Sequence, residues 1–162
     1  IHRHPHIYGD TEVANEADVK ANWERIKLRE GKKSVLQGVP AGLPALVKAN
    51  RIQEKVAGVG FDWEQPEQVL DKVREELGEL EAERRAGNAD ALEAEMGDVF
   101  FSLVNYARFL GINPENALER TNKKFMARFD FLESRAREAG RELSDMTLAE
   151  MDVHWEEAKK QP

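Results

Sequence analysis

The sequence predicts an all-α fold, an antiparallel helical bundle whose helices are joined by short connections. Apolar residues recur at helical spacing from residue 44 onward, and no alternating strand pattern competes with them. The chain holds only 11 Gly and 6 Pro, and several of these fall where one helical pattern stops and the next begins. Charged residues make up 34%, which suits helices with solvated outer faces. A length of 162 residues fits one domain, or one domain with an appendage.

Five helices are predicted in the regular part of the chain, over residues 44–57, 66–86, 90–110, 114–139 and 148–159. Asp90 with Glu93 three residues later predicts a capping box at the start of the third. Asn113 is the predicted cap of the fourth, with Pro114 at its first position, and Thr147 is the predicted cap of the last.

The first 43 residues are less regular. Residues 1–10 are irregular and rich in His, residues 16–33 favour a short helix, and residues 34–43 contain the Gly and Pro breakers of a linker. We therefore predict an appendage over 1–33, a linker over 34–43 and the main domain over 44–160. Because the chain begins at Ile1 rather than Met, it resembles a fragment of a longer protein, with processing as the alternative.

The overall composition excludes several classes of protein. A formal net charge of −7 disfavours general binding to nucleic acid or to anionic membranes. The absence of Cys excludes disulfides and thiolate metal sites. The longest apolar runs are far below the roughly 18 residues of a membrane span, and no signal peptide is visible. We expect a cytoplasmic protein.

Helical projection predicts the core-facing positions of the central helices. On 66–86 they are Val69, Val73, Leu77 and Leu80, and on 90–110 they are Leu92, Met96, Val99, Phe100 and Leu103. The fourth helix presents Leu118, Phe125, Phe129 and Leu132. These helices are apolar enough to pack on further neighbours, so we expect a homodimer.

Two pairs of acids flank these faces, Glu76 with Glu79 and Glu95 with Asp98, each pair one helical turn apart. If the helices fold back near Asn88, the pairs meet at levels that match to roughly 3 Å. At an effective dielectric near 20, each like-charge pair costs on the order of 3 kcal/mol. The acids must protonate, splay apart or bind cations, and an all-oxygen ligand set favours Mg²⁺ or Mn²⁺. Ordinary solvated helix acids are the alternative, and spacing alone does not decide.

Two bases, Lys124 and Arg128, flank the apolar face of the fourth helix one turn apart. Counting residues from the preceding turn places Lys124 near Asp98 and Arg128 near Glu95. Salt bridges from these two bases to the acids are one interpretation, and binding of a polyphosphate by the bases is the other. The four His residues, His2, His4, His6 and His154, lie outside the three central helices, which argues against a carboxylate-bridged di-iron bundle.

The acid pairs sit in "EELGE" and "EMGD", which resemble the E-E-x-x-E … E-x-x-D signature of the MazG nucleotide pyrophosphohydrolases. The segments "LPALVKANRIQEKVAGVGFDW", "VNYARFLG", "NKKFMARF" and "HWEEAKK" are similar to the C-terminal half of two-copy bacterial MazG proteins. The resemblance covers residues 43–160. It implies the all-α nucleoside triphosphate pyrophosphohydrolase fold, Mg²⁺ dependence, paired bundles, and hydrolysis of nucleoside triphosphates to monophosphate and pyrophosphate.

Site residues follow from the resemblance position by position. It implies metal ligands at Glu76, Glu79, Glu95 and Asp98, catalytic roles for Glu75, Lys124, Arg128 and Lys159, and substrate contacts by Trp63 and Trp155. Packing is the alternative role for both tryptophans. "RHPHIYGD" resembles the end of the first MazG copy, and "NWERIK" (22–27) echoes "HWEEAK" (154–159), so residues 1–33 are expected to be the tail of a truncated copy.

The expected reaction is attack of water on the α-phosphorus, with pyrophosphate leaving and Glu75 or Glu79 orienting the water. The expected partner is a nucleoside triphosphate, with no nucleic acid and no membrane. Two alternatives remain open: an enzyme like phosphoribosyl-ATP pyrophosphohydrolase, and a Mg-nucleotide-binding regulatory module with little turnover.

Overall fold

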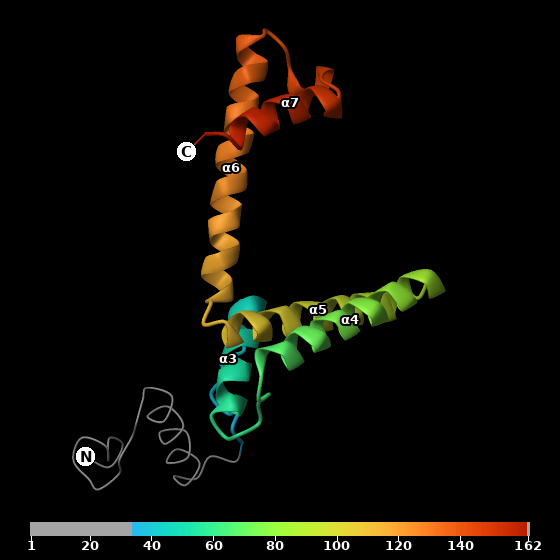
Figure 1. Cartoon of the computed structure of the whole chain (residues 1–162), viewed down its shortest axis with the longest axis vertical. Helices are drawn as coiled ribbons and strands as arrows, with labels where there is room; N and C mark the ends of the chain where they lie inside the picture. Colours follow the sequence, from blue (N-terminus) through green and yellow to red (C-terminus); the bar gives the residue numbers. More distant parts are fainter. Residues whose placement is uncertain (1–33, 162) are drawn as a thin grey trace, which may run out of the picture. The chain divides into compact units, whose positions relative to one another are not determined.

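The computed structural model describes residues 34–161, and every regular element among them is helical, which confirms the all-α prediction (Figure 1). In chain order the elements are α3 (Ala45–Ala57), α4 (Pro66–Ala86), α5 (Ala89–Phe109), α6 (Pro114–Glu138), the short 3-10 helix η1 (Leu143–Asp145) and α7 (Leu148–Ala158). The described residues form two compact units, 34–114 and 115–161, each treated separately below. The predictions for residues 1–33 lie outside the described residues.

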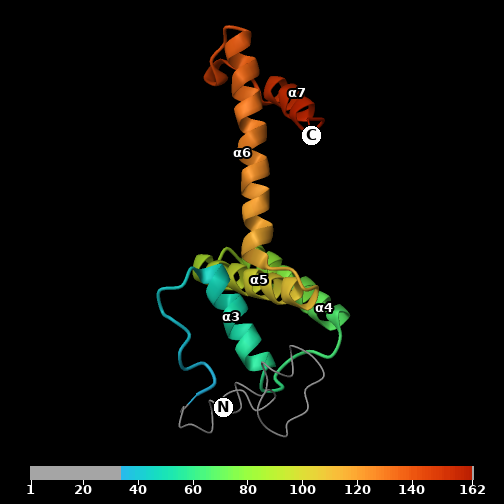
Figure 2. The ribbon, with the colours of Figure 1, turned by 90° about the vertical axis from the view of Figure 1, so that its left-hand side faces the viewer.

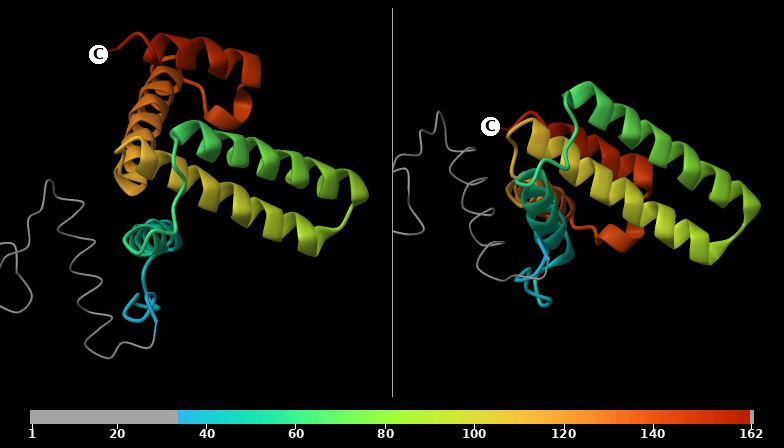
Figure 3. Two further views of the ribbon diagram at one scale, coloured as in Figure 1. Left: turned by 60° about the horizontal axis from the view of Figure 1, so that its bottom comes forward. Right: turned by 90° about the horizontal axis from the view of Figure 1, so that it is seen from below.

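Helices α4 and α5 form an antiparallel hairpin, as both views in Figure 3 show. Gly87 ends α4 in the left-handed conformation, with φ 73°, which costs glycine little because it has no Cβ. Asn88 then caps α5, its side-chain oxygen accepting a hydrogen bond from the Ala91 amide at 3.4 Å. The predicted cap at Asp90 was wrong. Asn88 satisfies the first-turn amides two residues earlier, so Asp90 lies inside the first turn.

Helix α3 crosses the hairpin and contacts α5 (Figure 2). Gln53 of α3, only 3% exposed, donates from Nε2 to the carbonyl oxygen of Phe101 at 2.8 Å. The segment before α3 is tied to it as well. Lys48 Nζ donates to the carbonyl oxygen of Ala41 at 2.6 Å, and Lys55 Nζ donates to that of Val35 at 3.3 Å. These side chains hold parts of the predicted linker against the helix.

The buried core of the first unit is narrower than predicted. Its buried apolar side chains are carried by α4 and α5: Val69, Val73, Val99 and Val104. Four predicted core residues are instead exposed by 39–57%, and we call them the exposed apolar face: Leu77, Met96, Phe100 and Leu103. A helical-wheel projection identifies the apolar stripe of each helix. The contact between two helices covers only part of each stripe, so the rest of it is exposed.

In the second unit, the chain turns back after α6 so that α7 contacts it (Figure 1). The rings of Phe125 and Trp155 lie 4.9 Å apart between centroids, and Arg135 Nε lies 3.8 Å from the Glu157 carboxylate. Leu132 is buried as predicted, but Leu118, Phe125 and Phe129 of the predicted α6 face are 37–55% exposed within the described chain. Among residues 34–161, each helix is too short or too polar to span a bilayer.

The predicted cap of the last helix is confirmed. Thr147 accepts from the Glu150 amide at 3.3 Å, and the Glu150 carboxylate accepts from the Thr147 amide at 2.7 Å, completing a capping box. Arg141 also donates to Glu150, at 2.6 Å. The Arg141 guanidinium and the Thr147 donors lower the pKa of Glu150 to about 2.

The pKa of Glu150 predicts a pH-dependent contribution to the stability of this unit. A lowered folded-state pKa stabilises the fold above the ordinary value of 4.5, and this contribution is lost as the pH falls toward about 2. Glu150→Gln is expected to melt at a lower temperature than the parent at pH 7, with the difference shrinking below about pH 4.5. Thermal melts between pH 7 and pH 3 measure it, with the exposed Glu142→Gln as control. A pH-independent difference would contradict this role.

Candidate functional site

Three of the four predicted acids come together on the α4–α5 hairpin. One carboxylate oxygen from each of Glu76, Glu79 and Glu95 lies within 4.8 Å of the other two. Glu76 and Glu79 are neighbours because they are one turn apart on α4, and the antiparallel return of α5 brings Glu95 opposite them. Glu76 is 7% exposed, Glu95 is half-buried and Glu79 is exposed. We call these residues the acid group.

Asp98 lies outside the acid group. It is one turn beyond Glu95 on α5 and its side chain is exposed. Counting residues from the hairpin turn fixed its level along the helix axis, but the direction in which it points also depends on how α5 packs against α4. Its role as a metal ligand remains a prediction.

Lys72 is a member of the site that the sequence reasoning missed. Its Nζ lies 2.7 Å from Glu76 Oε1 and 2.7 Å from Glu75 Oε1, and the hydrogen bonds to Glu75 and then Glu76 raise the pKa of Lys72. The spacing of Lys72 and Glu76, four residues apart on a helix, was the signal available in the sequence. Lys72 therefore neutralises part of the charge of the acid group, and it also holds Glu75.

The acid group retains carboxylate charge that the protein does not neutralise. Partial desolvation raises the pKa of Glu79, and a hydrogen bond to Glu76 with repulsion by Glu76 and Glu95 adds to that rise. Oε2 of Glu95 is buried without a hydrogen-bond partner among the described residues. Buried acceptors are normally paired, so this oxygen is available to a bound cation.

The donor set fits a divalent cation. All three ligand atoms are carboxylate oxygens, the type that hard divalent cations prefer. Opposite ligands of Mg²⁺ lie about 4.2 Å apart, given bonds of about 2.1 Å. The three oxygens of the acid group all lie within 4.8 Å of one another, close to that distance.

The remaining predicted bases and Trp155 belong to the second unit. Lys124 is exposed and Arg128 is half-buried, and neither forms an ion pair within residues 115–161. Lys159, at the end of α7, is paired with Glu156, and Trp155 packs against Phe125. The predicted approach of Lys124 and Arg128 to the acids remains a prediction.

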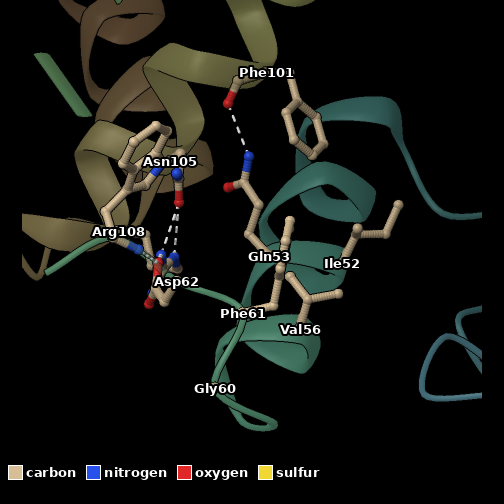
Figure 4. A pocket seen from close by; sticks show the side chains of 10 residues that line it. Ile52, Gln53, Val56, Gly60, Phe61, Asp62, Phe101, Asn105 and Arg108 are labelled. Atoms are coloured by element: carbon tan, nitrogen blue, oxygen red, sulfur yellow. Dashed lines mark hydrogen bonds and ion pairs between the residues drawn. The ribbon is translucent and has the colours of Figure 1, made fainter. Parts of the chain in front are cut away.

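Figure 4 shows a pocket of the first unit with a volume of about 450 Å³. Trp63 is among the residues that line it. The pocket lies between α3, the loop that follows it and α5, and is lined by Ile52, Gln53, Val56, Gly60, Phe61, Asp62, Trp63, Phe101, Asn105 and Arg108. Arg108 holds the loop, donating to the two carboxylate oxygens of Asp62 at 2.8 and 2.5 Å. No functional role was predicted for Gln53, because neither its burial nor its contact with α5 is evident from sequence spacing.

Fold and acid group together define a helical protein with a carboxylate site suited to a divalent cation. Residues 64–130, which include the acid group, match the model of the MazG nucleotide pyrophosphohydrolase domain. Over this segment the chain is similar to the MazG family. This confirms the resemblance on which the fold and site were predicted.

Relatives match over nearly the whole chain. The nucleoside triphosphate pyrophosphohydrolase of Escherichia coli K12 is 41% identical over 98% of this chain and 63% of its own length. The nucleoside triphosphate pyrophosphohydrolase/pyrophosphatase MazG of Thermotoga maritima is 41% identical over 98% of this chain and 61% of its own length. The uncharacterized protein YabN of Bacillus subtilis is 49% identical over 99% of this chain and 34% of its own length. The chain thus spans less than two thirds of each of these relatives.

Proposed function

We propose that this protein is a Mg²⁺-dependent nucleoside triphosphate pyrophosphohydrolase that cleaves ribo- or deoxyribonucleoside triphosphates to monophosphate and pyrophosphate and clears the nucleotide pool. The acid group is the observation that carries the proposal, since three carboxylates with a buried unpaired oxygen are suited to a divalent cation. The names of the relatives from Escherichia coli and Thermotoga maritima support this substrate class.

Glu76, Glu79 and Glu95, with Asp98 as the predicted fourth ligand, would hold the metal. When bound, Mg²⁺ supplies electrophilic activation of the phosphates and makes water more acidic. Glu75 or Glu79 would orient the attacking water toward the α-phosphorus and accept its proton. Lys124, Arg128 and Lys159 would stabilise the charge that develops on the phosphates, and Trp155 would contact the substrate. Mn²⁺ is an acceptable substitute for Mg²⁺ in an all-oxygen site.

Pyrophosphate release from a panel of nucleoside triphosphates and phosphoribosyl-ATP, with and without Mg²⁺, tests this proposal. We expect release from the triphosphates only when the metal is present. Turnover confined to phosphoribosyl-ATP would favour that related enzyme. Nucleotide binding without pyrophosphate release would contradict the proposal and favour a regulatory module.

We propose that the exposed apolar face is covered by a second copy of the chain. Leu77, Met96, Phe100 and Leu103 leave 39–57% of their surface exposed on two adjacent helices, and grouped exposed apolar side chains are a feature of interaction surfaces. Light scattering at tens of micromolar protein is expected to give the mass of a dimer, and Phe100→Glu is expected to shift it toward the monomer. The exposed Glu93→Gln on the same helix is the control. A monomer under these conditions would contradict pairing.

We propose that residues 44–160 form the catalytic domain and that 1–33 are the tail of a truncated MazG copy. Residues 1–33 contain no two acids three residues apart, the spacing of Glu76 and Glu79. Deletion up to residue 33 is expected to leave kcat within about twofold of the parent, as for changes remote from a reacting site. A folded deletion variant without turnover would contradict this assignment. Since its proposed substrates are metabolic nucleotides, we propose a cytoplasmic location.

A further inference from the structure

A half-buried ion pair joins the loop between α3 and α4, residues 58–65, to the end of α5. We propose that the two residues of this pair, Arg108 and Asp62, are positioning residues that hold Trp63 where it contacts the nucleotide. The inference rests on the proposed function and on the substrate contact predicted for Trp63, and it adds two residues that act through that side chain. Its evidence is the geometry of the pair, its link to the Trp63 backbone and the way in which the rest of the loop is held.

The Arg108 guanidinium is held in one orientation by its neighbours. Nη1 and Nη2 donate to the two carboxylate oxygens of Asp62 at 2.8 and 2.5 Å, and such a two-point contact fixes the orientation of both groups. The side-chain oxygen of Asn105, one turn earlier on α5, accepts from Nε and Nη2 at 3.0 and 2.8 Å (Figure 4). The guanidinium also lies 4.7 Å from the centre of the Phe109 ring. Arg108 therefore offers the loop a fixed point on a helix.

The Asp62 carboxylate connects this fixed point to Trp63. Its Oδ1, which accepts from Arg108 Nη2, also accepts from the backbone amide of Trp63 at 3.0 Å. The side chains of Arg108 and Asp62 are 18% and 25% exposed, so solvent screens their attraction less than that of a surface pair. One oxygen atom thus links the end of α5 to the backbone of Trp63.

Backbone hydrogen bonds and a helix cap hold the two ends of the loop. At the first end, the Phe61 amide donates to a carbonyl oxygen of α3 at 3.0 Å, and at the other the Gln65 amide donates to Gln68 Oε1 at 2.9 Å. Within residues 34–161, the amides of Asp62 and Trp63 donate to no backbone carbonyl. The Trp63 side chain is 45% exposed, so packing covers only part of it. The Asp62 carboxylate is therefore the main restraint on the middle of the loop.

A restrained Trp63 has a specific consequence for kinetics. Placing the side chain before the substrate arrives reduces the conformational entropy that binding must remove. A contact made equally in the ground state and the transition state acts on KM and leaves kcat unchanged. A pair that served only the stability of the fold would instead change the fraction of active enzyme, and so the apparent kcat, without changing KM.

The kinetic test removes the guanidinium with Arg108→Met, which keeps the apolar stem of the side chain. We would measure kcat and KM for whichever nucleoside triphosphate of the panel above is hydrolysed fastest. KM is expected to rise about tenfold, as for one charge-assisted contact, with kcat within about twofold of the parent. The effect should depend on Trp63. Trp63→Ala is itself expected to raise KM, and adding Arg108→Met to it should raise KM by no more than about twofold further. Full additivity of the two substitutions, or an unchanged KM in either single variant, would overturn the inference.

Arg84→Met is the matched control. Arg84 makes a similar two-point pair with Glu81, at 2.6 and 2.8 Å, but both residues lie on α4 and their side chains are 64% and 40% exposed. Its loss should leave KM and kcat within about twofold of the parent.

Asp62→Ala is a second variant that tests the inference even if Arg108→Met does not fold. It removes both hydrogen bonds of the carboxylate without leaving an unpaired acid in the loop, and Arg108 keeps its bonds to Asn105. KM is expected to rise at least as much as in Arg108→Met. Asp62→Ala with the KM of the parent would overturn the inference.

A measurement without nucleotide separates the inference from the proposed function. NMR relaxation of the Trp63 indole nitrogen, assigned with Trp63→Phe, reports motion of this side chain on the ps–ns timescale. We expect a rigid indole in the parent and in Arg84→Met, and a mobile one in Arg108→Met and Asp62→Ala. That result in a parent that releases no pyrophosphate would reject the proposed function and leave the positioning of Trp63 by the pair standing. Equal mobility of the indole in the parent and in both loop variants would overturn the inference.

Discussion

Glu95→Gln is expected to lower hydrolysis of nucleoside triphosphates by at least about a hundredfold, because a catalytic metal contributes several kcal/mol to the transition state. The variant keeps the shape of the side chain but removes one charge from a group whose carboxylate oxygens lie within 4.8 Å. Stabilisation of the fold by Mg²⁺ is expected to weaken sharply, since a ligand that binds only the folded state stabilises it in proportion to its affinity. Pyrophosphate release and melting curves with and without Mg²⁺ measure both effects.

Without metal, the same variant is expected to be as stable as the parent or more stable by up to about 1–2 kcal/mol, because it relieves repulsion that water only partly screens. Glu93→Gln, an exposed acid two residues away on α5, is the matched control and should change neither activity nor the Mg²⁺ effect. Hydrolysis by Glu95→Gln at the parent rate would contradict the metal site and favour ordinary solvated helix acids.

Lys124→Ala and Arg128→Ala are each expected to lower kcat/KM by about tenfold or more, equivalent to about 1.4 kcal/mol of lost transition-state stabilisation. Neither side chain forms an ion pair within residues 115–161, so little folding energy should depend on them there. Both variants are therefore expected to keep the parent melting temperature within a few degrees and to bind Mg²⁺ normally. Steady-state kinetics and thermal melts make the comparison.

The neighbouring Lys123→Ala provides the control for these two variants. Its side chain is 75% exposed and pairs with Glu119 at 3.4 Å, a surface ion pair of small expected energy. It should leave kcat/KM unchanged within about twofold, the range expected away from the reacting groups. Parallel losses of stability and activity in Lys124→Ala or Arg128→Ala would instead assign these residues to structural salt bridges.

The sequence predicted the features that are decided within one or two helical turns. The predicted bounds of α4, 66–86, match the structure, and Gly87 and Thr147 end and begin helices as expected. The pairing of Glu76 with Glu79 follows from the same local geometry. The prediction of the α5 cap failed because a second candidate cap, Asn88, lies two residues before Asp90 and caps the helix instead.

Tertiary structure alone decided which predicted residues meet. Glu95 lies close to Glu76 and Glu79, whereas Asp98 lies outside that group. The position of a residue along a helix can be counted from the sequence, but the rotation of α5 about its own axis is set by its packing. The bond from Gln53 to Phe101 joins residues 48 apart, and that from Arg108 to Asp62 joins residues 46 apart. Contacts over such distances depend on the packing of several helices together, so no periodicity in the sequence encodes the pocket. Hydrogen bonds within a turn and hydrophobic periodicity determined the helices, and long-range packing decided where their side chains converge.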